Sequence, residues 1–187
     1  MRFFANSAVA KCIMVLTVAL SVFLGPFLTL GAMRQAAEDI FFLGAYSDGL
    51  SINSDLEEAA AEARNLVTVA ERYLPEGDSR MNAVLEAASH LVNTPFVDEK
   101  NAAAASLIRA VSALEAAVAA EALSDSDAQY VARSLTNFNG RFKTIANDPY
   151  HREAQRFNDT LRRFPARLFG ALLNIRPLEL FTAGTGG

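Results

Sequence analysis

Apolar residues form one long unbroken run, followed by several segments in which they recur every three or four positions. The run covers residues 12–33 and holds 22 consecutive residues without a charge. As a helix it is about 33 Å long, enough to cross a hydrocarbon core of about 30 Å. We therefore expect a membrane anchor over residues 1–33. A cleaved secretory signal is the alternative, because Gly25 and Pro26 can bend the run and a small-residue cleavage site follows.

The charges on the two sides of this run predict its orientation. Arg2 and Lys11 precede the run, whereas Arg34, which follows it, lies near Glu38 and Asp39. Basic residues close to a span favour its cytoplasmic side. We therefore expect a single-pass protein of the cell membrane, with its N-terminus inside and its remaining domain outside the cytoplasm.

The later segments have the spacing of amphipathic helices, each with one face buried against neighbours. The expected caps of their helices are Asp78 or Ser79, Thr94, and Asp148, and Pro95 and Pro149 fit the first turns that follow. The expected helix starts are Ser54, Asp78, Thr94, Ser126 and Asp148.

Two of these starts have the spacing of a capping box. Ser54 is followed by Glu57, and Ser126 by Gln129, each three residues on. In this motif the two side chains satisfy backbone N–H groups that the helix leaves free. We therefore expect Ser54 and Ser126 to be N-caps.

The apolar stripes of the segments define the expected core. Tyr150, Phe157 and Phe164 are spaced seven residues apart, and we interpret them as an aromatic column in the core rather than the wall of a ligand site. The residues predicted to carry the core are Leu56, Val67, Leu107, Val111, Leu114, Leu135, Phe138, Phe142, Phe157, Leu161 and Phe164.

These patterns predict an all-α fold. Alanine, the best helix former, is abundant, as in residues 102–105, and no useful stretch alternates as a strand does. We expect an antiparallel up-and-down bundle of about four long helices, preceded by one N-terminal transmembrane helix. The bundle is expected over residues 34–181, with a flexible tail over residues 182–187.

Charge is distributed unevenly along the chain, whose net charge is −4. Residues 34–127 hold 6 basic and 17 acidic residues, and residues 128–187 hold 9 basic and 4 acidic residues. The simplest interpretation is that the two parts pack together and offset each other. The alternative is a basic C-terminal surface for an acidic partner or anionic lipid. The acidic domain as a whole disfavours nucleic acid as a partner.

The basic surface would lie around the last apolar segment. There the arginines alternate with apolar residues, which is typical of an element at a membrane surface or a protein interface. A solvated basic edge over a hydrophobic closing segment is the alternative. The candidate interaction or membrane-surface residues are Arg162, Arg163, Arg167, Phe169 and Arg176.

Groups suited to catalysis or metal binding are few, since the chain has two histidines and one cysteine. Glu86 and His90 are four residues apart, not three as in the Glu-x-x-His pair of di-iron bundles. No serine has the glycine-flanked setting of a nucleophile, and no glycine-rich phosphate loop is present. We therefore predict no metal, no cofactor and no enzymatic activity.

The C-terminal third carries a series of paired motifs: Tyr150-His151, Phe157-Asn158, Phe164-Pro165 and Arg176-Pro177, followed by Phe181. In order and spacing they resemble the end of the LemA family, which has two Tyr-Asn pairs, then Phe-Pro, then Lys-Pro-x-x-Phe. The segment around Asn65 is similar to the family's Pro-Asn-Leu-Val helix. The family-motif positions are Asn65, Tyr150, Phe157, Asn158, Phe164, Pro165, Pro177 and Phe181.

The chain departs from the family pattern at His151, where the family has Asn, at Phe157, where it has Tyr, and at Arg64, where it has Pro. Acidic residues also stand where the family has basic ones before that Pro, which puts a basic surface there in doubt. The resemblance implies an antiparallel four-helix bundle on a single-pass anchor, and no established reaction.

The sequence thus predicts a membrane-anchored helical bundle of the LemA type, acting as a non-enzymatic interaction or scaffold module in the cell envelope. Its expected partners are the membrane, through a single span, and an unknown envelope protein. An extracytoplasmic ligand-sensing bundle that relays to a partner protein is the alternative, and a hydrolase is a third class.

Overall fold

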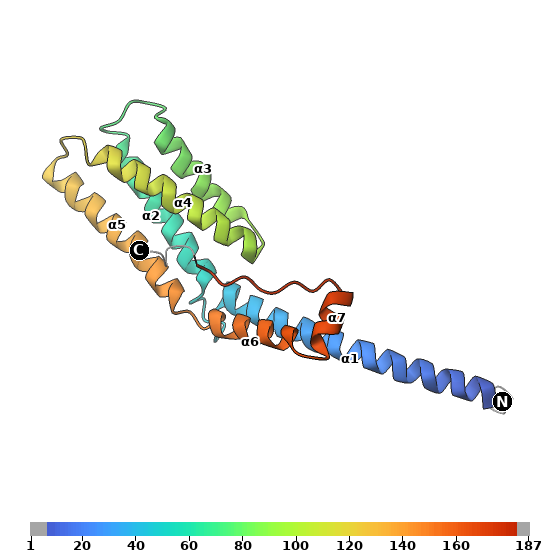
Figure 1. Ribbon diagram of the computed structural model, residues 1–187. Helices are drawn as coiled ribbons and strands as arrows, with labels where there is room; N and C mark the ends of the chain where they lie inside the picture. The colour runs from blue at the N-terminus through green and yellow to red at the C-terminus, as the bar shows by residue number, and fades with distance from the viewer. Residues whose placement is uncertain (1–6, 183–187) are drawn as a thin grey trace. The chain divides into compact units, whose positions relative to one another are not determined.

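The computed structural model describes residues 7–182, and within them leaves out the side chains of residues 7–9, 19, 20, 22, 23 and 26. Over residues 7–182 the chain forms seven α-helices and no strand, which confirms the all-α prediction (Figure 1). The helices are α1 (Ser7–Leu43), α2 (Ile52–Ala70), α3 (Ser79–Asn93), α4 (Val97–Val118), α5 (Asp125–Ala146), α6 (Tyr150–Arg162) and α7 (Ala166–Leu172).

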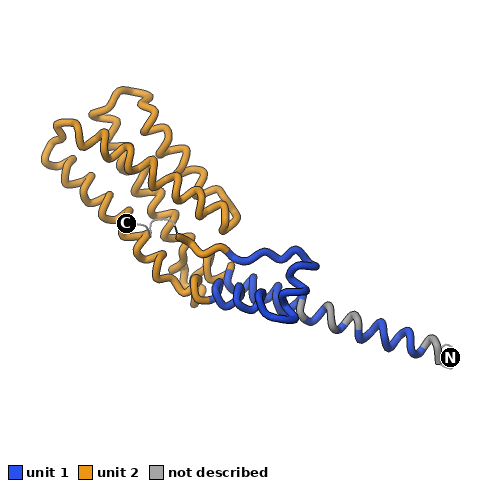
Figure 2. The backbone as a smooth tube through the Cα atoms, viewed as in Figure 1, with its two compact units in different colours: residues 1–37, 153–178 blue, residues 38–152, 179–187 orange. Residues whose placement is uncertain are grey.

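The chain divides into two compact units (Figure 2). Unit 1 comprises residues 1–37 and 153–178, and unit 2 comprises residues 38–152 and 179–187. Unit 1 contains most of α1, most of α6 and all of α7. The buried apolar side chains of unit 1 are Leu30, Ala37, Ala154, Phe157, Leu161, Phe169 and Leu178.

Unit 2 contains the helical bundle. In it α2 packs against α3, α4 and α5, and α3 packs against α4. Side-chain pairs join α2 and the turn after it to α5, among them Arg72 with Asp127 at 2.8 Å, Glu62 with Asn137 at 2.9 Å, and Asp55 with Arg141 at 3.2 Å. Close approach at α2 is helped by small residues, because Ala59, Ala60 and Ala63 are completely buried.

Most of the predicted core is confirmed. Leu135 is only half-buried, because it lies toward the edge of the stripe on α5 that Phe138 and Phe142 bury. The predicted core residues that are buried are Leu56, Val67, Leu107, Val111, Leu114, Phe138, Phe142, Phe157 and Leu161.

Phe164 is the predicted core residue for which the prediction is wrong. Tyr150 and Phe157 are 0% exposed, but Phe164 is 85% exposed. The reason is that α6 ends at Arg162, so the helical period that brings Tyr150 and Phe157 inward does not extend to Phe164. The aromatic column therefore has two buried members rather than three.

Both predicted capping boxes are also wrong. The N-cap of α2 is Ser51, whose hydroxyl accepts from the Ser54 N–H at 3.1 Å, while the Ser51 N–H donates to the Ser54 hydroxyl at 3.2 Å. The helix begins earlier than predicted because Ile52 is completely buried and extends the apolar stripe. The N-cap of α5 is Ser124, whose hydroxyl accepts from the Asp127 N–H at 3.2 Å.

Of the other predicted helix starts, Asp78 and Asp148 are confirmed and Thr94 is wrong. Asp78 caps α3 by accepting from the Arg80 N–H at 2.8 Å, and Asp148 accepts from the Tyr150 N–H at 2.8 Å. Thr94, predicted to begin α4, instead closes α3, since its hydroxyl donates to the His90 carbonyl at 2.8 Å. A threonine hydroxyl that bonds back to position i−4 serves the preceding helix, so α4 begins later, at Val97.

The predicted anchor over residues 1–33 falls partly outside the described residues. Arg2 belongs to residues 1–6, which the structure does not describe. Several side chains in the middle of the run are not described either. Among the described helices, it is α4, outside the predicted anchor, that is long and apolar enough to cross a membrane, and 39% of its most apolar window is buried. That is weak evidence of a span, because core helices of soluble bundles pass the same test.

Candidate functional site

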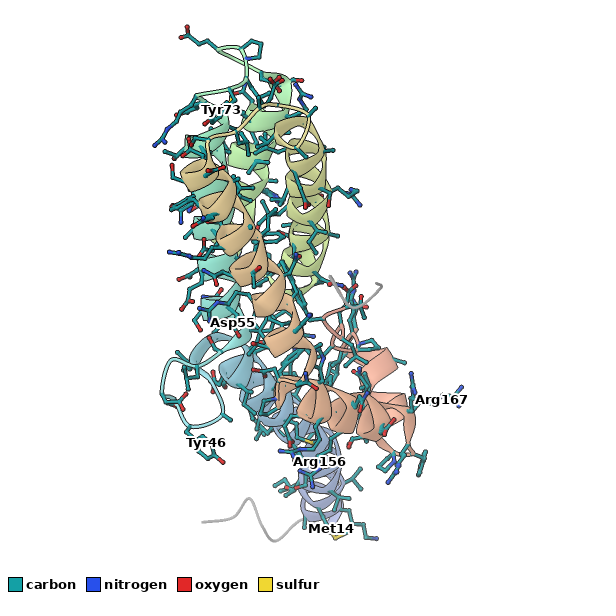
Figure 3. All side chains as sticks on the ribbon, turned by 90° about the vertical axis from the view of Figure 1, so that its left-hand side faces the viewer. Met14, Tyr46, Asp55, Tyr73, Arg156 and Arg167 are labelled. Atoms are coloured by element: carbon teal, nitrogen blue, oxygen red, sulfur yellow. The ribbon has the colours of Figure 1, made fainter. Side chains whose placement is uncertain are left out.

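The predicted basic surface lies in unit 1, around α7. Arg162, Arg163 and Arg167 are exposed, and Figure 3 shows Arg167 pointing away from the helices. Arg162 lies 3.8 Å from Asp159, with both side chains largely in solvent, so this pair contributes little to stability. At this surface, the structure therefore brings together three of the five candidate residues.

Of the other two candidates, Arg176 is exposed as predicted and Phe169 is not. Phe169 is buried, because it lies on the side of α7 that packs inward together with Gly170, where the Leu161 side chain occupies the space next to Gly170. Arg176 is exposed, but its backbone carbonyl is engaged by Nη1 of Arg34 at 3.3 Å. Phe169 is therefore a packing residue of unit 1 rather than a surface residue.

Exposed apolar side chains accompany the arginines, and none of them was among the five candidate residues. Phe164, Leu168 and Leu172 are all more than half exposed. Arg162, Phe164, Arg167 and Leu168 line a shallow hollow of about 420 Å³. We name the set Arg162, Arg163, Phe164, Arg167, Leu168 and Leu172 the α7 surface. The signal that could have revealed it is Pro165, which ends the preceding helical period.

Several motif positions hold the C-terminal segment in place. In unit 1, the Asn158 side chain donates to the Leu178 carbonyl and accepts from the Leu178 N–H, both at 2.8 Å. In unit 2, the Tyr150 hydroxyl donates to the Glu179 carbonyl at 2.7 Å, and Phe181 is buried. These positions therefore act through packing and backbone contacts.

The remaining motif positions are less engaged. Asn65 is half-buried on α2, and its side-chain amide donates to Glu62 at 3.4 Å. Pro165 and Pro177 are exposed; Pro165 lies between α6 and α7, and Pro177 lies in the non-helical segment after α7.

A pocket in unit 2 was not predicted from the sequence. It has a volume of about 450 Å³ and is lined by the loop after α1, the start of α2 and the end of α5. Its polar side chains include Asp55, Glu58, Arg141 and Asp148. Asp55 and Arg141 are 86 residues apart in the chain, so no local sequence pattern predicts their contact.

The electrostatics of this pocket are set by one arginine among several carboxylates. Arg141 pairs through Nη1 with Asp55 at 3.2 Å and through Nη2 with Glu58. Burial raises the pKa of the Asp55 carboxyl, and the nearby Glu58 and Asp148 raise it further, against the lowering effect of Arg141. Burial also raises the pKa of Asp148. A pocket with carboxylates in excess is suited to a cation.

The loop beside the pocket has a defined backbone. Gly44 has a φ of +87°, and a side chain there would run into the Leu50 carbonyl, so glycine is required. The Gly49 N–H donates to the Leu43 carbonyl at 3.1 Å, and the Leu50 N–H donates to Asp48 at 3.1 Å. The loop thereby holds Tyr46 in an exposed position, which Figure 3 shows at the edge of the molecule.

The two histidines are in separate places. His90 lies in the last turn of α3, where a positive charge is favourable, and a ring nitrogen of His151 lies 2.9 Å from the Ile145 carbonyl. Among the described residues, no three His, Cys, Asp or Glu side chains are grouped so as to hold a metal ion.

Comparison with known proteins gives a match to one family model. The LemA family model matches residues 50–186. This range covers α2–α7 and all the motif positions named from the sequence. No curated protein and no solved structure matches the chain.

Proposed function

We propose, from the premise that this chain belongs to the LemA family, that it is a single-pass membrane-anchored helical bundle. In this proposal the bundle is a non-enzymatic interaction or scaffold module in the cell envelope, and its partner is another envelope protein. The N-terminus lies inside the cell and the helical domain over residues 34–181 lies outside the cytoplasm. The family membership itself confirms the resemblance drawn from the C-terminal motifs.

The observation that carries the membrane anchor is the exposure of α1. Four consecutive large apolar residues, Ile13, Met14, Val15 and Leu16, are 45 to 70% exposed. Successive residues of a helix point about 100° apart, so these four cover all sides of it and leave no polar face. A helix that is apolar all round is unfavourable in water but suited to lipid.

Hydroxyl groups within the apolar run support the same interpretation. Thr17, Ser21 and Thr29 each donate to the backbone carbonyl four residues earlier, at 2.8 to 2.9 Å. In lipid, where no water is present, polar groups must be satisfied internally, and this bond does so within the helix itself.

We further propose that α2–α5 form an antiparallel up-and-down bundle. The support is the order of the pairs between α2 and α5: the end of α2 at Arg72 meets the start of α5 at Asp127, and the start of α2 at Asp55 meets Arg141 near the end of α5. Short connections, such as residues 94–96 between α3 and α4, also favour antiparallel neighbours.

An interaction role is supported by apolar side chains that stay exposed on the helical domain. Tyr46 and Leu50 project from the loop after α1, with 88% and 76% of their surface exposed. Clustered exposed apolar residues are typical of interaction sites. Cross-linking of the protein in intact membranes, followed by mass spectrometry, would identify the partner.

Membrane anchoring can be tested by fractionating cells that express the full chain with a C-terminal tag. We expect the intact chain in the carbonate-resistant membrane pellet. The double variant Leu16→Arg and Leu24→Arg should leave the pellet, because each arginine within a span costs about 2.5–3.5 kcal/mol of insertion free energy.

The control for that experiment is Leu85→Arg, a similar change at an exposed position of α3, which should remain in the pellet. A shortened wild-type chain in the soluble fraction would show that the segment is a cleaved signal. Digestion of the bundle by protease added outside intact spheroplasts would support the proposed orientation, and protection of the bundle would contradict it.

The pocket in unit 2 favours a second candidate function, a ligand-sensing bundle that relays to a partner. Its excess of carboxylates over the single Arg141 points to an amine as the ligand class. Sensing would then depend on pH, because a carboxyl with a raised pKa must lose its proton before it pairs with a cation.

We expect small amines such as putrescine to raise the melting temperature of the full chain, as the ligand stabilises the folded state, and more strongly at neutral pH than near the ordinary aspartate pKa of about 3.9. Asp55→Asn should remove this shift, whereas Asp98→Asn at an exposed position of α4 should retain it. The sensing function would be ruled out by an equal shift in the two variants, or by no shift in the wild type.

A further inference from the structure

The α7 surface combines an exposed apolar stripe with arginines on one short element. Leu168 and Leu172 lie four residues apart on α7, and Arg163 and Phe164 stand in the short connection just before it. Steps of four keep helical side chains on nearly the same side. Phe169, in contrast, is buried and packs α7 within unit 1.

The position of this element relative to α1 is defined within unit 1. Nη1 of Arg34 donates to the Arg176 carbonyl at 3.3 Å, and Arg34 is the first charged residue after the uncharged run of residues 12–33. The chain just after α7 is thus tied to the end of the proposed span, where lipid headgroups lie.

Burial along α1 indicates the same boundary. Phe27 and Leu28 are exposed, whereas Leu30 is buried. Among the described side chains, the packing of unit 1 around α1 therefore stops close to Leu30, and Phe27 and Leu28 are left for lipid. An element packed in unit 1 lies within reach of the membrane surface at that point.

We propose that the α7 surface binds anionic phospholipid headgroups through Arg162, Arg163 and Arg167 and places Phe164, Leu168 and Leu172 in the membrane interface. This inference rests on the membrane anchor proposed above. Arginine pairs with phosphate oxygens through two parallel hydrogen bonds, which favours phospholipid over other anions at a membrane surface. Among the described residues, no ion pair is recorded for Arg163 or Arg167.

Lipid is favoured over a protein as the occupant for two reasons. The anchor keeps the α7 surface close to the bilayer at all times, so binding needs no second encounter. The arrangement of basic and apolar residues on one side is that of interfacial membrane elements, in which attraction to anionic lipid adds to burial of the apolar side chains.

The test uses the full chain in nanodiscs, with Cys12→Ala to remove the native thiol and Leu172→Cys to attach an environment-sensitive fluorophore. Quenching by lipids that carry a nitroxide near the headgroup reports contact with the membrane. We expect quenching to be about twofold stronger in nanodiscs that contain phosphatidylglycerol than in phosphatidylcholine alone. The triple variant Arg162→Gln, Arg163→Gln and Arg167→Gln should lower it to the phosphatidylcholine level.

A matched control removes three other exposed arginines, by Arg64→Gln, Arg109→Gln and Arg133→Gln, and should leave the quenching unchanged. Equal quenching in both lipid compositions, or no effect of the first triple variant, would overturn the role of anionic lipid. A blue-shifted but unquenched fluorophore would show that protein, such as a second copy of the chain, covers the surface, and would also overturn the inference.

Labels at two further positions separate this inference from the proposed anchor. A fluorophore at Leu16→Cys should be quenched if α1 spans the membrane, and one at Leu85→Cys on α3 should not. If position 16 is quenched but position 172 is not, the α7 proposal alone fails. If position 16 is unquenched, the anchor itself is wrong.

Discussion

Replacing Phe157 with alanine is expected to lower the free energy of unfolding of the chain by about 3–5 kcal/mol, as for other fully buried phenylalanines. Phe157 is 0% exposed and lies among the buried side chains of unit 1. The loss combines the transfer of the ring to water with the cavity left behind. Denaturant unfolding in detergent micelles, followed by circular dichroism, measures it.

Phe164→Ala is the matched control for this substitution. It removes the same ring from a position seven residues on that is 85% exposed, so we expect a change within about 0.5 kcal/mol. Equal losses in the two variants would contradict the assignment of Phe157 to the core and of Phe164 to the surface.

The second large effect is expected at Lys100, whose side chain is only 2% exposed on α4. Its ammonium group donates to the Leu91 carbonyl at 2.9 Å, near the end of α3. In a longer helix that carbonyl would accept from residue 95, but Pro95 has no N–H to give. Lys100 therefore satisfies an acceptor that the helix cannot satisfy, and its positive charge meets the negative end of the helix dipole.

We expect Lys100→Ala to lower the free energy of unfolding by about 3 kcal/mol, from an unsatisfied carbonyl together with a cavity where the aliphatic stem lay. Lys100→Met retains most of the stem and should lose only about 1–2 kcal/mol. Lys143→Ala, at an exposed position of α5, is the control and should change little. If Lys100→Ala behaves like the control, the structural role of this lysine is wrong.

The same residue predicts a pH dependence. Burial lowers the pKa of Lys100, against a smaller opposing effect of Glu57. Just below the ordinary lysine pKa of about 10.4, the unfolded chain then binds more protons than the folded chain, so the free energy of unfolding rises with pH in that window. The rise should be present in the wild type and reduced in Lys100→Met, which denaturant titrations at several pH values would reveal.

Helix periodicity predicted the bundle core well because the stripes of α2 and α4 are long and regular. It failed where a local choice depends on packing elsewhere. Ser51 and Ser54 both suit an N-cap, and only the burial of Ile52 decides between them. Phe164 continued a numerical spacing but not a helix, since α6 ends at Arg162.

The candidate site was predictable only in part. The arginines of the α7 surface stand out in the sequence, but the inward orientation of Phe169 depends on how α7 packs in unit 1. The pocket with Asp55 and Arg141 depends on contact between α2 and α5, far apart in the chain. The burial of Lys100 depends on how α3 and α4 pack, and Pro95 is the sequence feature that leaves a carbonyl of α3 in need of a donor.

The paired hydrogen bonds between the Asn158 side chain and the backbone of Leu178 determine the alignment of the final segment. One side-chain amide binds both the backbone N–H and the backbone carbonyl of a single residue. A slip that brought Pro177 to Asn158 would lose one of the two bonds, because proline has no N–H. Insertions or deletions between α6 and Pro177 should therefore change the length of the connection and leave the contact between Asn158 and Leu178 intact.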